Sequence, residues 1–194
     1  SELVAEERER AGRRQRLQAE EFNHRVKNAL TLIGAMVSQS QVRRGDMGAF
    51  VADLQGRIKS LALAHDLATK PGVLELGELL RIELKPHGEA SLSLEGPSVW
   101  LGDETSGIAA LLVHELVTNA AKYGALSAPS GKISVRWQLD AEGGCSLHWT
   151  ERGGPVVTEP SRTGFGMLLV TRQVPFELGG RSAVRYAAEG LEVD

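Results

Sequence analysis

The sequence predicts an α+β protein in which a helical hairpin precedes a mixed α/β layer. Apolar side chains recur at spacings of three and four in the first third of the chain, the period of amphipathic helices. Beyond residue 70, strand-like alternation is interleaved with helical patterns. Lys70-Pro71-Gly72 separates the two regions. We therefore expect a charged helical linker over residues 1–14, a hairpin over 15–70 and an α/β domain over 71–194.

The predicted hairpin consists of two amphipathic helices. The first has an apolar seam and ends at Gly45-Asp46, just after two arginines that suit a helix C-terminus. A second periodic run follows. The seam residues are Phe22, Val26, Ala29, Ile33 and Met36 in the first helix, and Val51, Leu54, Ile58 and Leu61 in the second. A lone hairpin is too thin to bury both faces, so we expect it to pack on a second hairpin or on the rest of the chain.

The α/β region reads as short strands around three helices. We expect helices at about 77–85, at 104–123 and from about 165, the last ended or kinked by Pro175. The strands are expected in "VLEL", "SLSLEG", "KISVRWQL", "CSLHWT" and near 183–188, with a further strand beginning in the terminal "GLEVD", where the end of the chain would cut it short. In the hairpin of "KISVRWQL" and "CSLHWT", every second residue is expected to face inward, namely Ile133, Val135, Trp137 and Leu139 in the first strand and Cys145, Leu147 and Trp149 in the second.

Composition excludes several classes of protein. The 194 residues carry a net charge of −3, which gives no general attraction to nucleic acid or anionic membrane. The single Cys145 excludes an internal disulfide, no Cys/His cluster has zinc spacing, and no apolar run is long enough for a membrane segment. These features favour a cytoplasmic protein. The chain begins with Ser, which leaves open that it is a piece of a longer protein.

The segment "HELVTNAAKYGAL" places chemistry on one face of a helix. Glu115, Asn119 and Lys122 stand at i, i+4 and i+7 and therefore share one stripe. A carboxylate, an amide oxygen and an ammonium on that stripe suit a hydrated Mg²⁺ and a phosphate chain. The ordinary alternative is a solvated helix face, although asparagine has a poor propensity for a helix interior.

Two glycine-containing segments follow. In "WTERGGPVV", Glu151 could accept a hydrogen bond from an exocyclic amine, while Gly153 and Gly154 would let the backbone approach a flat ring. A plain strand-to-loop turn is the alternative. In "TGFGMLLV", Gly164 and Gly166 open a helix whose free N–H groups favour phosphate, which is weak evidence by itself.

The segment "NHRVKN" in the first predicted helix contains a histidine. If Phe22 and Val26 lie in the seam, His24 falls on the outer side of the helix, where a histidine is ordinarily just a surface residue. Asn28 lies one turn further along the same side, so a group reacting at His24 would meet its amide. The spacing alone does not decide whether His24 is an ordinary surface residue or a reactive one.

The order of these motifs resembles that of the sensor histidine kinases. More narrowly, the chain resembles the HWE group, named for a histidine in the asparagine box and a Trp-x-Glu pair in the first glycine box. The corresponding residues are His114 in "HELVTNAAKYGAL" and Trp149 and Glu151 in "WTERGGP". "NHRVKN" is similar to the phosphoacceptor box of the same group. The resemblance spans about residues 15–190.

The resemblance implies a dimerisation and phosphotransfer hairpin followed by an α/β sandwich that binds ATP, of the Bergerat or GHKL type. It implies that ATP phosphorylates His24, with Asn28 nearby, and that Asn119 binds Mg²⁺ with Glu115 at a metal or water contact. Lys122 would meet the phosphates and Glu151 the adenine. His114, Tyr123, Trp149, Gly153, Gly154, Gly164 and Gly166 complete the expected nucleotide site. The implied partners are a response-regulator receiver domain, an upstream sensor domain and a second copy bound through the hairpin.

The chain departs from the common pattern at two places. Arg25 follows His24 where many histidine kinases have an acidic residue, so the proton acceptor is not identified; Glu21, three residues earlier, is a candidate. The sequence does not decide whether Arg25 and Lys27 contact an ATP phosphate or the receiver domain. Only eight residues separate Pro155 from Gly164, so the lid over the nucleotide is expected to be short.

Two other functions share this fold. Anti-sigma-factor serine kinases have the same ATP-binding fold but lack a phosphoacceptor hairpin, which the pattern over residues 15–68 predicts here. A phosphotransfer or scaffold protein with weak or no kinase activity would keep the hairpin and lose ATP binding. The retained Asn119, Lys122 and Glu151 favour the kinase over this alternative.

Overall fold

The structure is a computed structural model that describes residue 34 and residues 47–68, 74–88, 91–159 and 164–194. The chain forms two compact units, Ser1–Gln41 and Val42–Asp194. Apart from Gly34, all described residues belong to the second unit, whose architecture follows. The other residues of the first predicted helix, His24 and Asn28 among them, lie outside the described residues, so the form and position of that helix stay predictions.

A five-stranded mixed sheet forms one layer of this unit. Its strand order is β2, β4, β5, β7, β6, with β2 parallel to β4 and all other neighbours antiparallel. The bounds are Leu92–Glu95 for β2, Lys132–Leu139 for β4, Cys145–Arg152 for β5, Val184–Ala187 for β6 and Gly190–Val193 for β7. Two short strands, β1 (Leu74–Glu75) and β3 (Trp100–Leu101), form a separate antiparallel pair.

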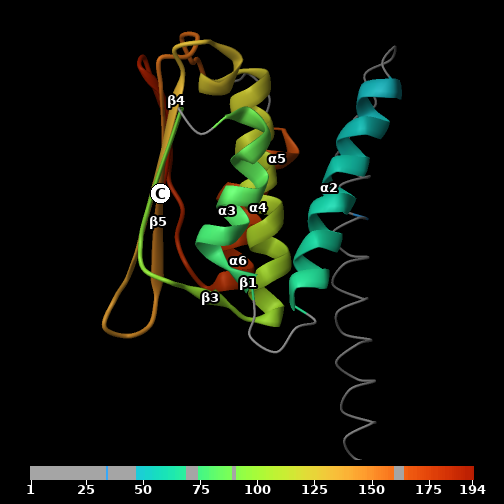
Figure 1. Ribbon diagram of the computed structural model, residues 1–194, viewed down its shortest axis with the longest axis vertical. Coiled ribbons are helices and arrows are strands. Elements are labelled where there is room, and N and C mark those ends of the chain that lie inside the picture. Colours follow the sequence, from blue (N-terminus) through green and yellow to red (C-terminus); the bar gives the residue numbers. More distant parts are fainter. Residues whose placement is uncertain (1–33, 35–46, 69–73, 89–90, 160–163) are drawn as a thin grey trace, which may run out of the picture. The chain divides into compact units, whose positions relative to one another are not determined.

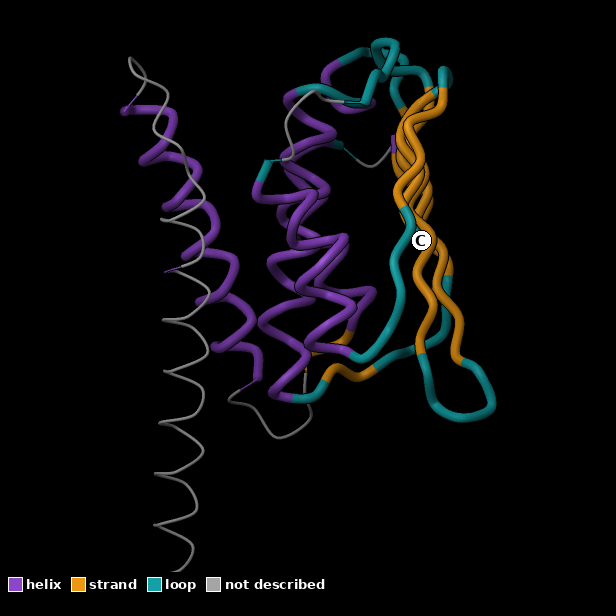
Figure 2. Tube along the Cα trace, turned by 180° about the vertical axis from the view of Figure 1, so that it is seen from behind, coloured by secondary structure: helices purple, strands orange, loops and turns teal. Residues whose placement is uncertain are grey.

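Helices cover one face of the sheet. The longest are α2 (Met47–Ala68), α3 (Leu76–Leu84) and α4 (Asp103–Lys122), and the shorter ones are α5 (Phe165–Leu168) and α6 (Val174–Leu178). Short 3₁₀ turns occur at Lys85–His87 and Ala125–Ser127. Figures 1 and 2 show α3 and α4 against the sheet, with α2 packed on the side of α4 that faces away from it. The predicted α+β class is confirmed.

The hydrophobic core lies between the sheet and helices α3 and α4. Leu79 and Leu80 of α3 and Leu116 of α4 are buried against Ile133 and Trp149 of the sheet. The inward alternation predicted for the hairpin holds for its middle. It is wrong at the tip, where Leu139 is 47% exposed and Cys145 is exposed. Figure 2 gives the reason, because the β4–β5 loop extends beyond the helices and leaves that end of the hairpin uncovered.

The element boundaries agree closely with the sequence patterns. Helix α4 runs over Asp103–Lys122 where 104–123 was expected, and the terminal "GLEVD" forms β7, which pairs with both β5 and β6. Before Pro175 the helix changes to a π-helical turn at Leu169–Gln173, then continues as α6. Proline has no N–H to donate, so an interrupted helical ladder is the expected result. Within the described residues, no helix has the length and apolar character that crossing a bilayer requires.

Candidate functional site

The predicted polar stripe of α4 lines a cleft. Glu115, Asn119 and Lys122 all border a cavity of about 590 Å³ at the C-terminal half of the helix. Glu115 is only 4% exposed, whereas Lys122 is exposed. Tyr123, the residue that ends α4, also borders the cavity and is 71% exposed. The stripe predicted from the sequence therefore forms a wall of a cleft, and Glu115 is its most buried member.

Glu151 reaches the same cleft from strand β5. Its carboxylate is buried and accepts two hydrogen bonds, one from the Ala125 backbone N–H at 2.8 Å and one from the Trp149 indole N–H at 3.1 Å. Burial raises the pKa of Glu151, and these two donors only partly oppose the rise. The carboxylate is thus held in one orientation at the cleft wall.

Trp149 itself does not border the cleft. It is fully buried in the core, two residues before Glu151 on the inward face of β5. Its indole N–H donates to Glu151, so the Trp-x-Glu pair joins a core side chain to a cleft side chain. This geometry explains why the two residues stand at a spacing of two, which puts them on one face of a strand.

The Gly-x-Gly segment borders the same cleft as Glu151. Gly164 and Gly166 both border the cavity. A Cβ on Gly166 would lie 2.7 Å from the Glu115 carboxylate and 3.2 Å from the Asn119 amide, so a larger residue here would force these side chains to shift. A Cβ on Gly164 would meet nothing within 4 Å, which leaves space beside the start of α5.

Gly153 and Gly154 lie outside the cleft lining and pack on the chain itself. Gly153 has φ of +71°, and a Cβ there would lie 2.5 Å from the Ser130 carbonyl oxygen. A Cβ on Gly154 would lie 2.8 Å from Ala125, whose N–H binds Glu151. These glycines therefore let β5 approach the loop after α4, which places Ala125 beside Glu151.

Replacing Gly153 with alanine is expected to lower the free energy of unfolding by about 2–4 kcal/mol, from left-handed backbone strain plus the contact with Ser130. Gly143 is a matched control, because it has φ of +87° but open space around it. Gly143→Ala should cost only the strain, about 1 kcal/mol. Urea denaturation monitored by tryptophan fluorescence measures both. Equal losses would contradict the close packing at Gly153.

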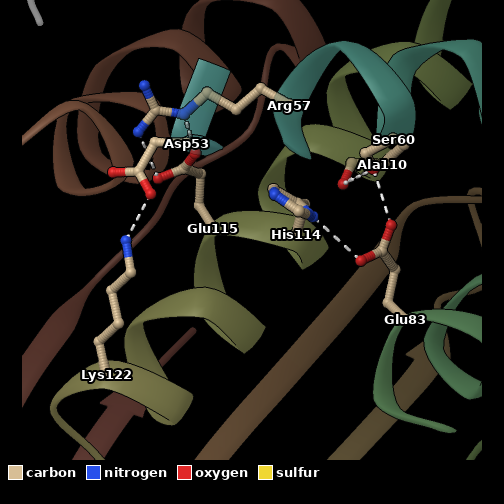
Figure 3. Close-up of polar contacts among 8 residues, drawn as sticks. All are labelled: Asp53, Arg57, Ser60, Glu83, Ala110, His114, Glu115 and Lys122. Carbon is tan, nitrogen blue, oxygen red and sulfur yellow. Dashed lines mark hydrogen bonds and ion pairs between the residues drawn. The ribbon is translucent and has the colours of Figure 1, made fainter. Parts of the chain in front are cut away.

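Helix α2 contributes two charged side chains that the sequence analysis did not assign to the site. Arg57 donates from Nε to Glu115 at 2.5 Å and from a terminal nitrogen at 3.2 Å, and Lys122 donates to Asp53 at 2.6 Å. Asp53 and Arg57 both border the cavity. Figure 3 shows the two side chains pointing from α2 toward α4. Two residues predicted to bind metal and phosphate are therefore ion-paired with α2.

His114 lies at a different place from the cleft residues. Its Nδ1 is 3.1 Å from Glu83 of α3, and Ser60 of α2 donates to the same carboxylate at 2.8 Å and contacts the Ala110 carbonyl (Figure 3). Burial raises the pKa of Glu83, but the hydrogen bonds and the charge of His114 outweigh it, so the pKa lies below its usual value. His114 thus joins α2, α3 and α4 and is not among the residues that border the cleft.

Eight further residues complete the cleft lining, namely Thr118, Gly124, Val156, Val157, Thr158, Met167, Tyr186 and Leu191. Thr118 directly precedes Asn119, and Met167 directly follows Gly166, so their neighbourhood could have suggested them. Nothing in the sequence singled out Tyr186 or Leu191, because strands β6 and β7 come to the cleft only through the sheet order.

The donor set of the cleft fits a magnesium ion that is bound mainly by phosphate and water. In the part of the chain that the structure describes, no three His, Cys, Asp or Glu side chains gather as a metal cage. Mg²⁺ commonly takes only one or two oxygen ligands from the protein beside substrate phosphates. Asn119 and Glu115, next to the Lys122 ammonium, offer those oxygens at one wall of the cleft.

Comparison with known proteins identifies the family. Residues 21–98 match the family model of the HWE histidine kinases. Two curated proteins described as blue-light-activated histidine kinases are similar over most of this chain. One from Rhizobium johnstonii is 32% identical over 90% of the chain, and one from Brucella ovis is 29% identical over 97%. The chain spans 51% and 40% of their respective lengths, about half or less of each relative.

Solved structures show the same fold. The histidine kinase domain of the blue-light-activated histidine kinase of Erythrobacter litoralis matches with a TM-score of 0.61 and 20% identity, over 91% of both chains. The longer structure of that protein matches with a TM-score of 0.67 and 23% identity, over 91% of this chain and 57% of its own. The sequence matches and the motifs described above agree: the chain belongs to the HWE group of histidine kinases.

Proposed function

We propose that the chain is the kinase part of a two-component sensor histidine kinase, which uses Mg-ATP to phosphorylate its own His24. One observation carries the proposal. The α4 stripe, Glu151 and the Gly164-x-Gly166 segment, which are distant in sequence, border one cleft. Their chemistry suits the phosphates, the metal and the base of one nucleotide.

Each cleft residue has a role that its position supports. Lys122 would bind phosphate oxygens, Asn119 would bind the metal with Glu115 beside it, and Glu151 would accept a hydrogen bond from the adenine amine. Gly164 and Gly166 would let the phosphates approach the start of α5, and Tyr123 would lie along the nucleotide. Mg²⁺, when bound, supplies charge neutralisation on the phosphate oxygens.

The structure suggests indirect roles for the other residues predicted to bind the nucleotide. Trp149 would orient Glu151, and Gly153 and Gly154 would hold the loop that carries Ala125. His114 would act through α2 and α3, because it contacts Glu83 and lies outside the cleft lining.

In the proposed reaction, a ring nitrogen of neutral His24 attacks the γ-phosphorus of ATP. The bond between the γ-phosphorus and the bridging oxygen breaks, ADP leaves, and the imidazole loses its other proton to a base. Asn28 would lie close to the transferred group. The phosphohistidine would then pass its phosphoryl group to an aspartate of a response-regulator receiver domain. By the same proposal the hairpin forms a homodimer, and an upstream sensor domain controls the reaction.

The proposal is tested by incubating the chain with γ-labelled ATP and Mg²⁺ and determining the stability of the label. Phosphohistidine is expected, which is labile in acid and stable in base. Addition of a receiver domain should then remove the label from the chain. An acid-stable label would contradict the proposal and favour a serine kinase, and absence of any label would favour the phosphotransfer or scaffold alternative.

A further inference from the structure

We infer that α2 and Mg-ATP compete for the same two residues of α4, so that docking of α2 lowers the affinity of the chain for the nucleotide. The inference rests on the proposed nucleotide site. Its starting point is that Glu115 and Lys122, the proposed metal-side and phosphate-binding residues, are both ion-paired with α2.

The two ion pairs resemble the charges of the expected ligand. Arg57 places a cation on Glu115, where the metal ion would bring positive charge, and Asp53 places a carboxylate on Lys122, where a phosphate would bring negative charge. Arg57 contacts both oxygens of Glu115, so a metal ion that approached this carboxylate would meet the repulsion of the guanidinium charge. Glu115 and Lys122 are thus occupied by groups of the same charge as the ligands that they would bind.

The environments of the two pairs differ. The side chains of Arg57 and Glu115 are 12% and 5% exposed, so this pair is screened little by water. Both side chains of the Asp53–Lys122 pair are 41% exposed, which makes it a weak, exchangeable contact. A phosphate chain with several charges would displace Asp53 readily, whereas release of Arg57 requires α2 to move or its side chain to turn.

A second polar cluster holds α2 on α4 outside the cleft. Ser60 of α2 bonds Glu83 and the Ala110 carbonyl, and His114 bonds the other oxygen of Glu83. Gly56 lies directly against the His114 ring, because a Cβ there would be 2.9 Å from Nε2. This cluster stabilises the docked position of α2 without touching the cleft, so it offers a remote way to weaken docking.

Linkage gives the expected direction. If only the undocked form of the cleft binds Mg-ADP or Mg-ATP well, the apparent affinity is reduced by the fraction that is undocked. A substitution that weakens docking must therefore tighten nucleotide binding. By reciprocity, saturating nucleotide must loosen α2.

The test measures the Kd of Mg-ADP for the 194-residue chain by isothermal titration calorimetry. Asp53→Asn should tighten binding about two- to fivefold, the range of an exposed ion pair. Gly56→Ala should tighten it about fivefold, because the new Cβ either displaces α2 or moves His114 away from Glu83. Gly107→Ala is the matched control in α4, since its Cβ would meet only Leu61 at an ordinary 3.7 Å, and it should leave the Kd unchanged.

The variants separate docking from local charge. If Asp53→Asn bound Mg-ADP more tightly but Gly56→Ala did not, the gain would come from the loss of a negative charge near the phosphates and not from weaker docking of α2. That result would overturn the inference. Equal Kd values in all variants would overturn it too, while leaving the proposed function intact. Absence of Mg-ADP binding in every variant would count against the proposed function, and with it the premise. As an independent readout, amide hydrogen exchange in Met47–Ala68 should become faster at saturating Mg-ADP, and slower or unchanged exchange would contradict competition.

Discussion

Substitution of His24 with glutamine is expected to abolish incorporation of labelled phosphate, with a loss of at least about 10³-fold. The glutamine amide keeps a polar side chain of similar size but has no nucleophilic nitrogen, whereas a neutral imidazole is nucleophilic near pH 7. The measurement is label bound to the purified chain after incubation with γ-labelled ATP and Mg²⁺. The proposed cleft is in the other compact unit of the chain, so the Kd of Mg-ADP should change little.

His87→Gln provides the matched control. His87 is exposed in the 3₁₀ turn Lys85–His87 and lies outside the cleft lining, so its substitution should leave the label unchanged. Asn119→Ala should also lose the label, but through loss of metal binding, and it should weaken Mg-ADP as well. Label that survives in His24→Gln would show that another residue accepts the phosphate and would remove the central assumption of the proposed reaction.

The part of the site that follows local periodicity could be predicted from the sequence. Glu115, Asn119 and Lys122 share a helical face because of their spacing. Glu151 lies on the inward face of a strand with alternating burial, near its C-terminal end. Both patterns depend only on residues within the same element. The side chains therefore lie on one face of their own helix or strand, however the surrounding elements pack.

The participation of α2 could not be predicted in the same way. Asp53 and Arg57 stand at i and i+4, the spacing of an ordinary surface pair within one helix. Their partners Glu115 and Lys122 are 58 and 69 residues further along the chain. Only the packing of α2 on α4 shows that these charges lie at the cleft. A pattern within one helix carries no information about which surface that helix will meet.

The glycines and the family histidine show a related limit. Gly153 and Gly154 were expected to admit a flat ring, but the space that they provide is filled by Ser130 and Ala125 of the chain itself. His114 was expected at the nucleotide, but it contacts Glu83 and lies against Gly56. A motif identifies a residue as constrained, while the contact that constrains it depends on the tertiary structure.

Substitution of Glu151 with glutamine is expected to raise the Kd of Mg-ADP by about 10- to 100-fold. Each carboxylate oxygen of Glu151 already accepts one hydrogen bond, from Ala125 or Trp149, and has a further lone pair for a donor in the cleft. In glutamine one oxygen becomes an NH₂ group, which would face either the Ala125 N–H or the Trp149 N–H. One buried donor would be left unpaired, at a cost of about 1–3 kcal/mol, and an acceptor for the adenine amine would be lost.

The pH dependence of binding gives a second test of the same residue. Burial raises the pKa of Glu151, so its carboxylate takes up a proton at a higher pH than an exposed glutamate. The protonated form loses acceptor capacity, and the affinity of the wild type for Mg-ADP should therefore decline as the pH falls through this raised pKa. Glu151→Gln has no such group and should lack that part of the decline, which calorimetric titrations at several pH values can measure.

Two further variants separate recognition from stability. Trp149→Phe keeps an aromatic ring in the core but removes the indole donor to Glu151, so binding should weaken by about tenfold, less than the largest loss expected for Glu151→Gln. Glu142→Gln in the exposed β4–β5 turn is the matched control for the charge change and should bind like the wild type. Equal affinity of Glu151→Gln and Glu142→Gln for Mg-ADP would contradict a role of Glu151 in recognition. Glu151 would then serve only to hold the loop with Ala125, and another part of the cleft would have to recognise the base.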